Sequence, residues 1–272
     1  MQYEDKMEAN DLKEKILKEY PRMKADDKFK FGCNPGVPCF NKCCNDVNIF
    51  LTPYDIIRLK NRLGISSTEF LEKYTLIPLD EKLNHPVVMF RMDDDTLNCR
   101  LLGENGCTVY EDRPWSCRMF PVGVASPKDG HKELDEEFYF ILREEVCQGF
   151  DYGKEWTVEE WIKDQEAEDY IYYGDLFKEI SLHDRFLKGR IKEPIKLEMF
   201  YTVCYDIDKF RDLVFNSSFF KRFKVDEKRK ELLRKDDVEL LKFGFEFLRF
   251  SLFGEKTMEL TDEYQVAFGE KK

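Results

Sequence analysis

Eight of the nine cysteines in this chain fall in two runs, and this grouping constrains the fold more than any other feature. The runs comprise Cys33, Cys39, Cys43 and Cys44, and then, after a long cysteine-free interval, Cys99, Cys107, Cys117 and Cys147. Thiolates are the soft ligands that zinc, copper(I) and iron–sulfur clusters prefer. Eight thiols suffice for two four-thiolate sites, or for one site with thiols to spare. We therefore expect the chain to fold around metal ions, which are its expected partners.

The beginning of the chain bears on whether these cysteines form disulfides instead. Residues 1–6 read Met-Gln-Tyr-Glu-Asp-Lys, and no basic segment followed by an apolar one is visible, so we expect no secretory signal. No apolar stretch approaches the roughly 18 residues that a membrane helix needs. The expected location is cytoplasmic, without a membrane partner. A reducing cytosol favours metal binding over disulfides, although disulfides and buried, inert thiols remain alternatives.

Composition limits the remaining classes of partner. The chain has 272 residues, of which 42% are hydrophobic and 24 are phenylalanine, so it can form a packed core without metal. Its net charge of −11 opposes binding to the phosphate backbone of nucleic acids, and we expect no nucleic-acid partner. The nature of a protein partner stays open.

The distribution of turns and apolar spacings predicts three parts along the chain. Residues 1–29 form a charged segment with a helical stretch, residues 30–170 a cysteine-cluster metal-binding domain, and residues 171–272 a helical C-terminal region. The expected fold class is α+β. Small β-hairpins and helices should surround a cysteine-ligated metal core, and an α-helical C-terminal region should follow it.

Local signals predict several elements within this outline. A helix should begin after Thr52, with Pro53 in its first turn and Asp55 completing a capping box, and should end at Gly64. A second helix should begin at Ser66. Hairpins are expected where strands flank turns, namely 87–92 with 96–102, a turn at 103–106, and 120–125 with 138–146. Apolar residues at 240, 241, 247 and 248 predict a helix, although the phenylalanines at 243, 245 and 247 also alternate as in a strand.

The spacing of the cysteines narrows the kind of metal site. No Cys-x-x-Cys pair is present, which disfavours a zinc ribbon or a thioredoxin-like motif, and the spacing is not that of a ferredoxin. All three histidines lie outside both runs, so the ligand set should be essentially all sulfur. Cys43 and Cys44 are adjacent, and in extended backbone their side chains would point to opposite faces. A single centre that binds both would need a local kink.

Two arginines flank Cys117 closely in the sequence. A thiolate-ligated centre carries net negative charge, and burying that charge is costly without cations or N–H donors nearby. Arg113 and Arg118 are therefore candidates for a cofactor-binding role just outside the ligands. Ordinary ion pairs with Glu111 and Asp112 are the alternative.

These motifs resemble the YkgJ-type cysteine-cluster family, which is described as a zinc- or iron-chelating domain. The resemblance is carried by three segments, 39–59, 107–121 and 147–161. It implies that the eight cysteines of the two runs bind the metal, as an iron–sulfur cluster of the [4Fe–4S] kind or as Zn²⁺. Cys204 has no counterpart in the family.

The expected function is that of a cytosolic metal-binding protein that holds an iron–sulfur cluster or clusters on eight cysteines, for which a redox role is one option. One alternative is a zinc-binding structural or interaction protein without catalysis. Another is a cluster-dependent modifying enzyme, because the cysteine cluster is similar to that of a flagellin lysine methylase. No glycine-rich nucleotide loop and no Ser-His-Asp set is present, so no catalytic residue is identified and it stays open whether the chain is an enzyme.

Overall fold

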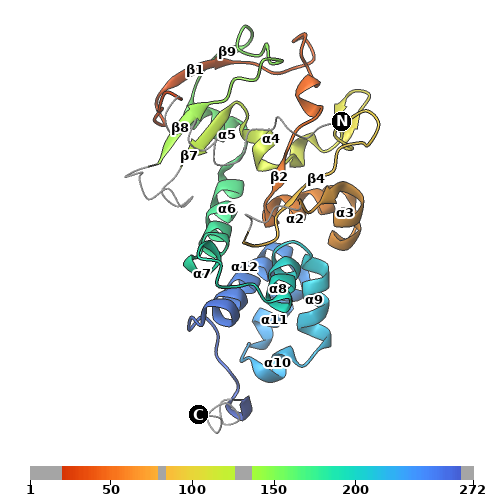
Figure 1. The fold of residues 1–272 in the computed structure, drawn as a ribbon, viewed down its shortest axis with the longest axis vertical. Coiled ribbons are helices and arrows are strands. Elements are labelled where there is room, and N and C mark those ends of the chain that lie inside the picture. Colours follow the sequence, from red (N-terminus) through yellow and green to blue (C-terminus); the bar gives the residue numbers. More distant parts are fainter. Residues whose placement is uncertain (1–19, 79–83, 126–136, 265–272) are drawn as a thin grey trace. The chain divides into compact units, whose positions relative to one another are not determined.

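The computed structural model describes residues 20–78, 84–125 and 137–264 (Figure 1). Within these residues, helices and small antiparallel sheets form an α+β protein with a helical C-terminal region, as the sequence predicts. The helical stretch expected around Leu12 and the polar stretch 126–136 lie outside the described residues. No helix of the described part of the chain combines the length and the apolar composition that crossing a membrane requires.

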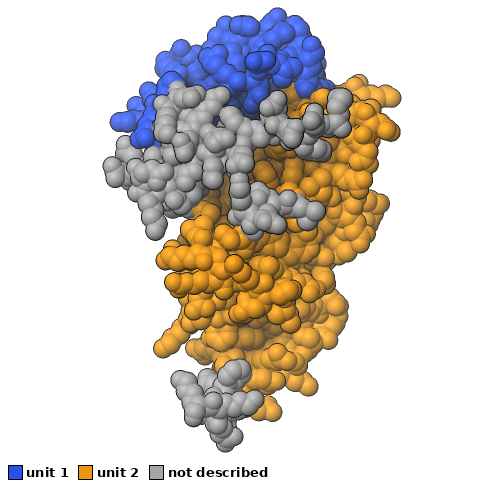
Figure 2. All heavy atoms as spheres, in the orientation of Figure 1, with its two compact units in different colours: residues 1–42, 119–166 blue, residues 43–118, 167–272 orange. Residues whose placement is uncertain are grey.

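The chain forms two compact units, each built from two separate segments. Unit 1 comprises residues 1–42 and 119–166, and unit 2 comprises residues 43–118 and 167–272 (Figure 2). The three-part division expected along the sequence stays a prediction.

Unit 1 consists of two strand pairs and a short helix. Its elements are β1 (Lys28–Phe31), β7 (Val122–Ala125), β8 (Phe138–Ile141), β9 (Lys154–Thr157) and α5 (Val158–Asp164). β1 pairs antiparallel with β9, and β7 pairs antiparallel with β8, so the hairpin expected around 126–137 has its two strands. Trp161 of α5 packs edge-on against Phe29 and Phe31, and its Nε1 donates to the carbonyl of Met119.

Unit 2 contains the other strands and most of the helices. Its strands are β2 (Phe50–Leu51), β3 (Thr75–Leu76), β4 (Val88–Phe90), β5 (Leu102–Gly103) and β6 (Gly106–Cys107). Its helices before the C-terminal region are α2 (Pro53–Leu63), α3 (Ser67–Tyr74) and the 3₁₀ turn η2 (Tyr110–Asp112). The helices of the C-terminal region are α6 (Glu168–Ser181), α7 (Asp184–Leu187), α8 (Pro194–Cys204), α9 (Ile207–Asn216), α10 (Phe219–Arg222), α11 (Glu227–Lys235), α12 (Asp237–Leu248) and the π-helical turn η4 (Arg249–Phe253). Two short helices, η1 (Lys42–Cys44) and α4 (Trp115–Met119), cross from one unit to the other along the chain.

The caps of α2 agree with the sequence prediction. The Thr52 hydroxyl accepts the N–H of Asp55, and the Asp55 carboxylate accepts the N–H of Thr52, which completes the capping box. Gly64 ends the helix with a φ of 66°, a left-handed conformation that glycine adopts without steric cost. α3 likewise begins where Ser66 accepts the N–H of Glu69.

A single hydrophobic core runs through unit 2. Leu59 of α2 and Phe70 of α3 are completely buried, and so are Phe210 of α9 and Phe243 of α12 in the same cluster. The alternating phenylalanines near 245 thus belong to a helix. α2 and α3 therefore share their core with the C-terminal helices.

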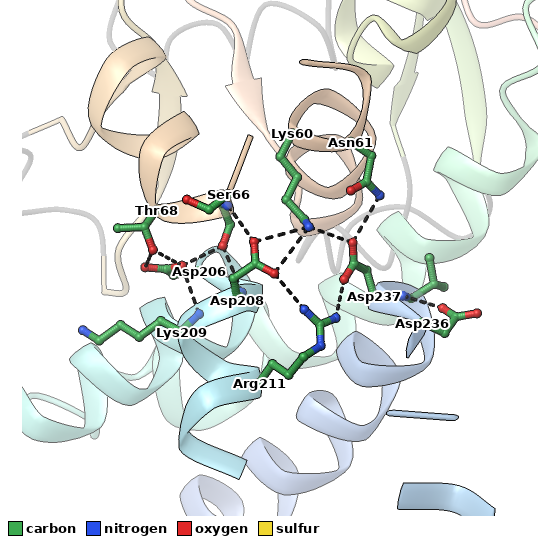
Figure 3. A network of polar contacts seen from close by, with 12 residues as sticks. Lys60, Asn61, Ser66, Thr68, Asp206, Asp208, Lys209, Arg211, Asp236 and Asp237 are labelled. Atoms are coloured by element: carbon green, nitrogen blue, oxygen red, sulfur yellow. Dashed lines mark hydrogen bonds and ion pairs between the residues drawn. The ribbon is translucent and has the colours of Figure 1, made fainter. Parts of the chain in front are cut away.

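A polar network joins the same helices beside this core (Figure 3). Lys60 of α2 has only 6% of its surface exposed, and its Nζ lies 2.9 Å from Asp237 and 3.3 Å from Asp208. Arg211 of α9 contacts both of these carboxylates. Ser67 at the start of α3 donates its hydroxyl to Asp206. The network fixes α2 and α3 against α9 and α12.

The strand prediction for 87–102 is wrong in its pairing. β4 pairs with β2 on one side and with β3 on the other, instead of forming a hairpin with 96–102. Among the described residues these two stretches share the isolated antiparallel bridge Met92–Cys99, and Arg100 donates to the carbonyl of Met92. The acidic turn is present, since Asp93 accepts the N–H and the hydroxyl of Thr96. β5 and β6 form the hairpin expected around 103–106.

Candidate metal centre

Cys43 and Cys44 lie in the 3₁₀ turn η1, at the beginning of unit 2. Two residues close to this turn have a positive φ, Asn41 with 66° and Asp46 with 48°. Left-handed backbone at non-glycine residues is uncommon. The local kink that a single centre would need to collect both thiols is therefore present.

Hydrogen bonds bring Cys99 and Cys107 to the same place. The N–H of Cys99 donates to the carbonyl of Cys44 over 2.7 Å, so the two runs of cysteines meet here. The carbonyl of Cys99 accepts the N–H of Leu102, and Leu102 pairs with Cys107 across the β5–β6 hairpin. These backbone hydrogen bonds therefore set the relative positions of Cys44, Cys99 and Cys107.

Cys117 is carried by α4, and Asp55 fixes the start of this helix. Asp55 is completely buried, and its second carboxylate oxygen accepts the N–H of Trp115 over 2.8 Å. Burial raises the pKa of this carboxyl to about 6, although its hydrogen bonds and the charge of Arg118 oppose the shift. One side chain thus caps α2 and also holds the helix that bears Cys117. The sequence identified Asp55 only as a cap.

The thiols of these five cysteines lie within electrostatic range of one another. The pKa of Cys44 is raised by a hydrogen bond to Cys43, by burial and by the charges of Cys117 and Cys99. Accepting that bond lowers the pKa of Cys43 to about 7. Cys117 is an exposed residue by its surface area, but the protein packed around its sulfur and the charges of Cys99, Cys107 and Cys43 raise its pKa. Each thiolate thus makes it harder for its neighbours to ionise, and a cation that binds the thiolates removes this repulsion.

Both predicted arginines are buried, and the charge of Arg113 acts on the thiols of this group. Arg113 has 8% of its surface exposed, and its guanidinium stacks 3.9 Å from the ring centroid of Tyr110 and donates to the carbonyl of the same residue over 2.6 Å. Burial lowers the pKa of Arg113, and the charges of Cys117 and Cys107 oppose this. Arg118 is 3% exposed. The structure thus places buried positive charge next to the thiols.

The other three grouped cysteines lie in unit 1. The Sγ of Cys39, a buried residue, accepts the N–H of Gln148 over 3.1 Å, which places it beside Cys147. Gly32 donates its N–H to the carbonyl of Gly149, which brings the segment containing Cys33 to the same loop. The eight candidates thus divide into five in unit 2 and three in unit 1.

The donors are chemically suited to a soft metal, although they do not surround a common point. None of the nine cysteines forms a disulfide. Within the described residues, no three His, Cys, Asp or Glu side chains are arranged so that they could hold a metal ion. His85 and His183 pack against phenylalanine rings, and His131 lies outside the described residues. The thiols of unit 2, with cations beside them, are the donor set that fits a zinc ion or an iron–sulfur cluster.

Cys204 is separate from these groups. It lies at the end of α8, is 2% exposed, and belongs to the hydrophobic core of unit 2. Burial alone raises the pKa of its thiol well above the usual value. It packs as a small apolar side chain, as the sequence predicts.

Comparison with known proteins identifies one related family. Residues 32–148 match the family model CxxCxxCC, described as "putative zinc- or iron-chelating domain". The matched segment contains all eight grouped cysteines and ends before α6. No curated protein and no solved structure matches the chain.

Proposed function

Because residues 32–148 match the family of zinc- or iron-chelating cysteine-cluster domains, we propose that this chain holds an iron–sulfur cluster or clusters on its grouped cysteines. The observation that carries the proposal is that five thiols of unit 2, those of Cys43, Cys44, Cys99, Cys107 and Cys117, lie within electrostatic range of one another. Iron–sulfur clusters are bound by cysteine thiolates. A bound cluster would supply one-electron chemistry, so the proposed role is redox.

The spacing of the thiols favours a cluster over structural zinc. Structural zinc sites commonly use pairs of cysteines two to four residues apart on a tight turn. Here Cys99 lies at an isolated bridge, Cys107 on β6 and Cys117 on α4; the β5–β6 hairpin joins the first two, and the bond from Trp115 to Asp55 holds α4. All eight grouped cysteines are proposed as ligands, five from unit 2 and three from unit 1.

The surrounding residues would offset and orient the charge of the ligands. Arg113 supplies positive charge beside Cys107 and Cys117, and Arg118 directly follows Cys117 in the chain. The N–H of Gln148 donates to the sulfur of Cys39. Hydrogen bonds and charges of this kind tune the potential of a cluster.

Anaerobic purification followed by iron, zinc and sulfide analysis tests the proposal. A brown protein with iron and acid-labile sulfide in similar amounts would support a cluster. A colourless protein that carries zinc and no sulfide would overturn the cluster and leave a zinc-binding protein. Aerobic purification of the same preparation is the control, since an oxygen-sensitive cluster would bleach there and zinc would persist.

A further inference from the structure

The loop between α7 and α8, residues 187–196, combines exposed apolar side chains with positive charge. It contains four Lys or Arg and a single Glu, in a chain whose net charge is −11. Ile195 has 76% of its surface exposed, the largest fraction among the large apolar side chains of the described residues, and Leu187 has 46%. The most exposed apolar side chain of the described protein thus lies in a strongly basic segment.

Two buried side chains hold this loop against the core of unit 2 and so define its outer side. Phe186 is completely buried and Ile191 is 3% exposed, and both belong to the hydrophobic core. The N–H of Gly189 donates to the carbonyl of Phe186, and Gly189 has a φ of 58°, so the chain turns sharply after α7. A Cβ on Gly189 would lie 3.4 Å from Cε of Lys192, so the two halves of the loop lie close together. The exposed side chains therefore project from one compact turn, away from the core.

Much of the positive charge of the loop is available to a partner. Lys188 and Lys196 each pair with a carboxylate within four residues, but the paired side chains are about half exposed, and ion pairs at such positions are weak. Arg190 and Lys192 are exposed, and neither forms an ion pair among the residues that the structure describes. These two cations can therefore contact an anionic partner without losing a carboxylate of the described protein.

The kinds of side chain in the loop favour a lipid surface over a protein as this partner. Sites that bind proteins tightly rely on Trp, Tyr and Arg in packed pockets, whereas this loop has no aromatic residue and three of its four cations are lysines. Peripheral membrane proteins insert apolar side chains into the boundary between head groups and acyl chains, and Lys or Arg beside them contact anionic head groups. The net charge of the whole chain does not prevent this, because charges farther away than about 8 Å are screened at physiological ionic strength.

We propose that residues 187–196 dock this protein on a membrane surface rich in anionic lipids. Leu187 and Ile195 enter the boundary between head groups and acyl chains, and Arg190 and Lys192 contact the head groups. The contact is reversible and needs no membrane-spanning helix, and the described part of the chain has none. It departs from the expectation of no membrane partner, because that expectation considered spanning segments and the charge of the whole chain. It does not depend on the metal centre, since no cysteine lies in the loop.

Co-sedimentation of the full-length protein with lipid vesicles tests the proposal. The parent protein should bind vesicles of phosphatidylcholine mixed with phosphatidylserine, bind pure phosphatidylcholine far less, and lose binding as the salt concentration rises. Since each Lys or Arg near an anionic surface contributes about five-fold to partitioning, Arg190→Ala/Lys192→Ala should lower the partition coefficient about 25-fold. A parent protein that does not bind the phosphatidylserine vesicles would overturn the proposal. Binding to poly-L-glutamate alone would also overturn it, in favour of an acidic protein partner.

Matched substitutions elsewhere in the C-terminal region separate the loop from the general surface of the protein. Lys221→Ala/Lys228→Ala removes two exposed lysines that form no ion pair within the described residues, and it should leave the partition coefficient unchanged. Leu187→Ser should weaken vesicle binding several-fold, whereas Leu232→Ser, at a leucine with a similar exposed fraction of 45%, should not. Equal losses in the loop variants and in these controls would overturn the proposal.

The fluorescence of Ile195→Trp gives a second readout, which reports insertion directly. The emission of the new tryptophan should shift to shorter wavelength when phosphatidylserine vesicles are added, and brominated lipid should quench it. The parent protein, which has three tryptophans of its own, is the control for the background. A variant that binds the vesicles with an emission change no larger than that of the parent would overturn the insertion of this loop.

Discussion

Replacing Asp55 with alanine should destabilise unit 2 through two separate contacts of one carboxylate. The first is the capping box with Thr52, and loss of such a cap typically costs about 1 kcal/mol. The second is the bond from the N–H of Trp115 over 2.8 Å, and an orphaned buried donor costs about 1–3 kcal/mol. At neutral pH, burying the charged carboxylate itself costs free energy, and this offsets part of the stability that the two contacts provide. We therefore expect a loss of about 1–3 kcal/mol at pH 7.

Thr52→Ala is the matched control for this experiment, because it removes the cap and leaves the bond to Trp115 in place. Urea unfolding of the chelated protein gives both free energies of unfolding, and hydrogen exchange at the Trp115 amide reports the bond itself. The loss in Asp55→Ala should exceed that in Thr52→Ala, and the Trp115 amide should lose protection only in Asp55→Ala. Equal losses with an equally protected amide would refute the reasoning.

The raised pKa of Asp55 gives this comparison a pH dependence. The folded pKa of about 6 lies above the ordinary aspartate pKa of 3.8, so the folded state binds the proton more tightly. The group therefore contributes stability that is fully present below the unfolded pKa and is lost as the pH rises through the folded pKa. The difference in free energy of unfolding between the parent protein and Asp55→Ala should be largest near pH 4 and should shrink toward pH 7. A difference that grows with rising pH would contradict this.

Three further predictions concern the core and the network of unit 2. Lys60→Met leaves two half-buried carboxylates with Arg211 as their remaining cation, so it should cost about 2–3 kcal/mol in urea unfolding, less than the loss of a fully buried pair; a loss below about 1 kcal/mol would contradict the network. Gly244→Ala would place a Cβ 2.6 Å from a methyl of Val203, so overpacking of about 1–3 kcal/mol should outweigh the gain in helix propensity, and an increased melting temperature would be unexpected. After chelation, hydrogen exchange should rise in α4 and the β5–β6 hairpin while α2 and α12 stay protected by their shared core; uniform loosening of unit 2 would speak against this.

Local elements of the fold could be predicted because their signals are short-range. Thr52, Asp55 and Gly64 define the ends of α2 by contacts within a few residues, and the structure reproduces them. The pairing of β4 was not predictable in this way. Alternating apolar residues predict that a segment is a strand, but they do not predict which strand it pairs with. Long-range contacts place β4 between β2 and β3.

The candidate site could likewise be predicted only in part, because its residues are brought together by tertiary contacts. The sequence identified the cysteines as two runs, whereas the fold places Cys39 beside the loop of Cys147 and Cys44 beside Cys99. Residues adjacent in a run thus fall in different units.

Metal content of two cysteine variants tests the central claim most directly. Cys117→Ser removes one of the five neighbouring thiols of unit 2. Cys204→Ser removes a thiol that packs in the hydrophobic core instead. Purified in parallel with the parent protein, Cys117→Ser should lose most of its bound metal, and Cys204→Ser should keep the full amount with a modest loss of stability from the buried hydroxyl. Full metal content in Cys117→Ser, or an equal loss in Cys204→Ser, would contradict the assignment of the metal centre.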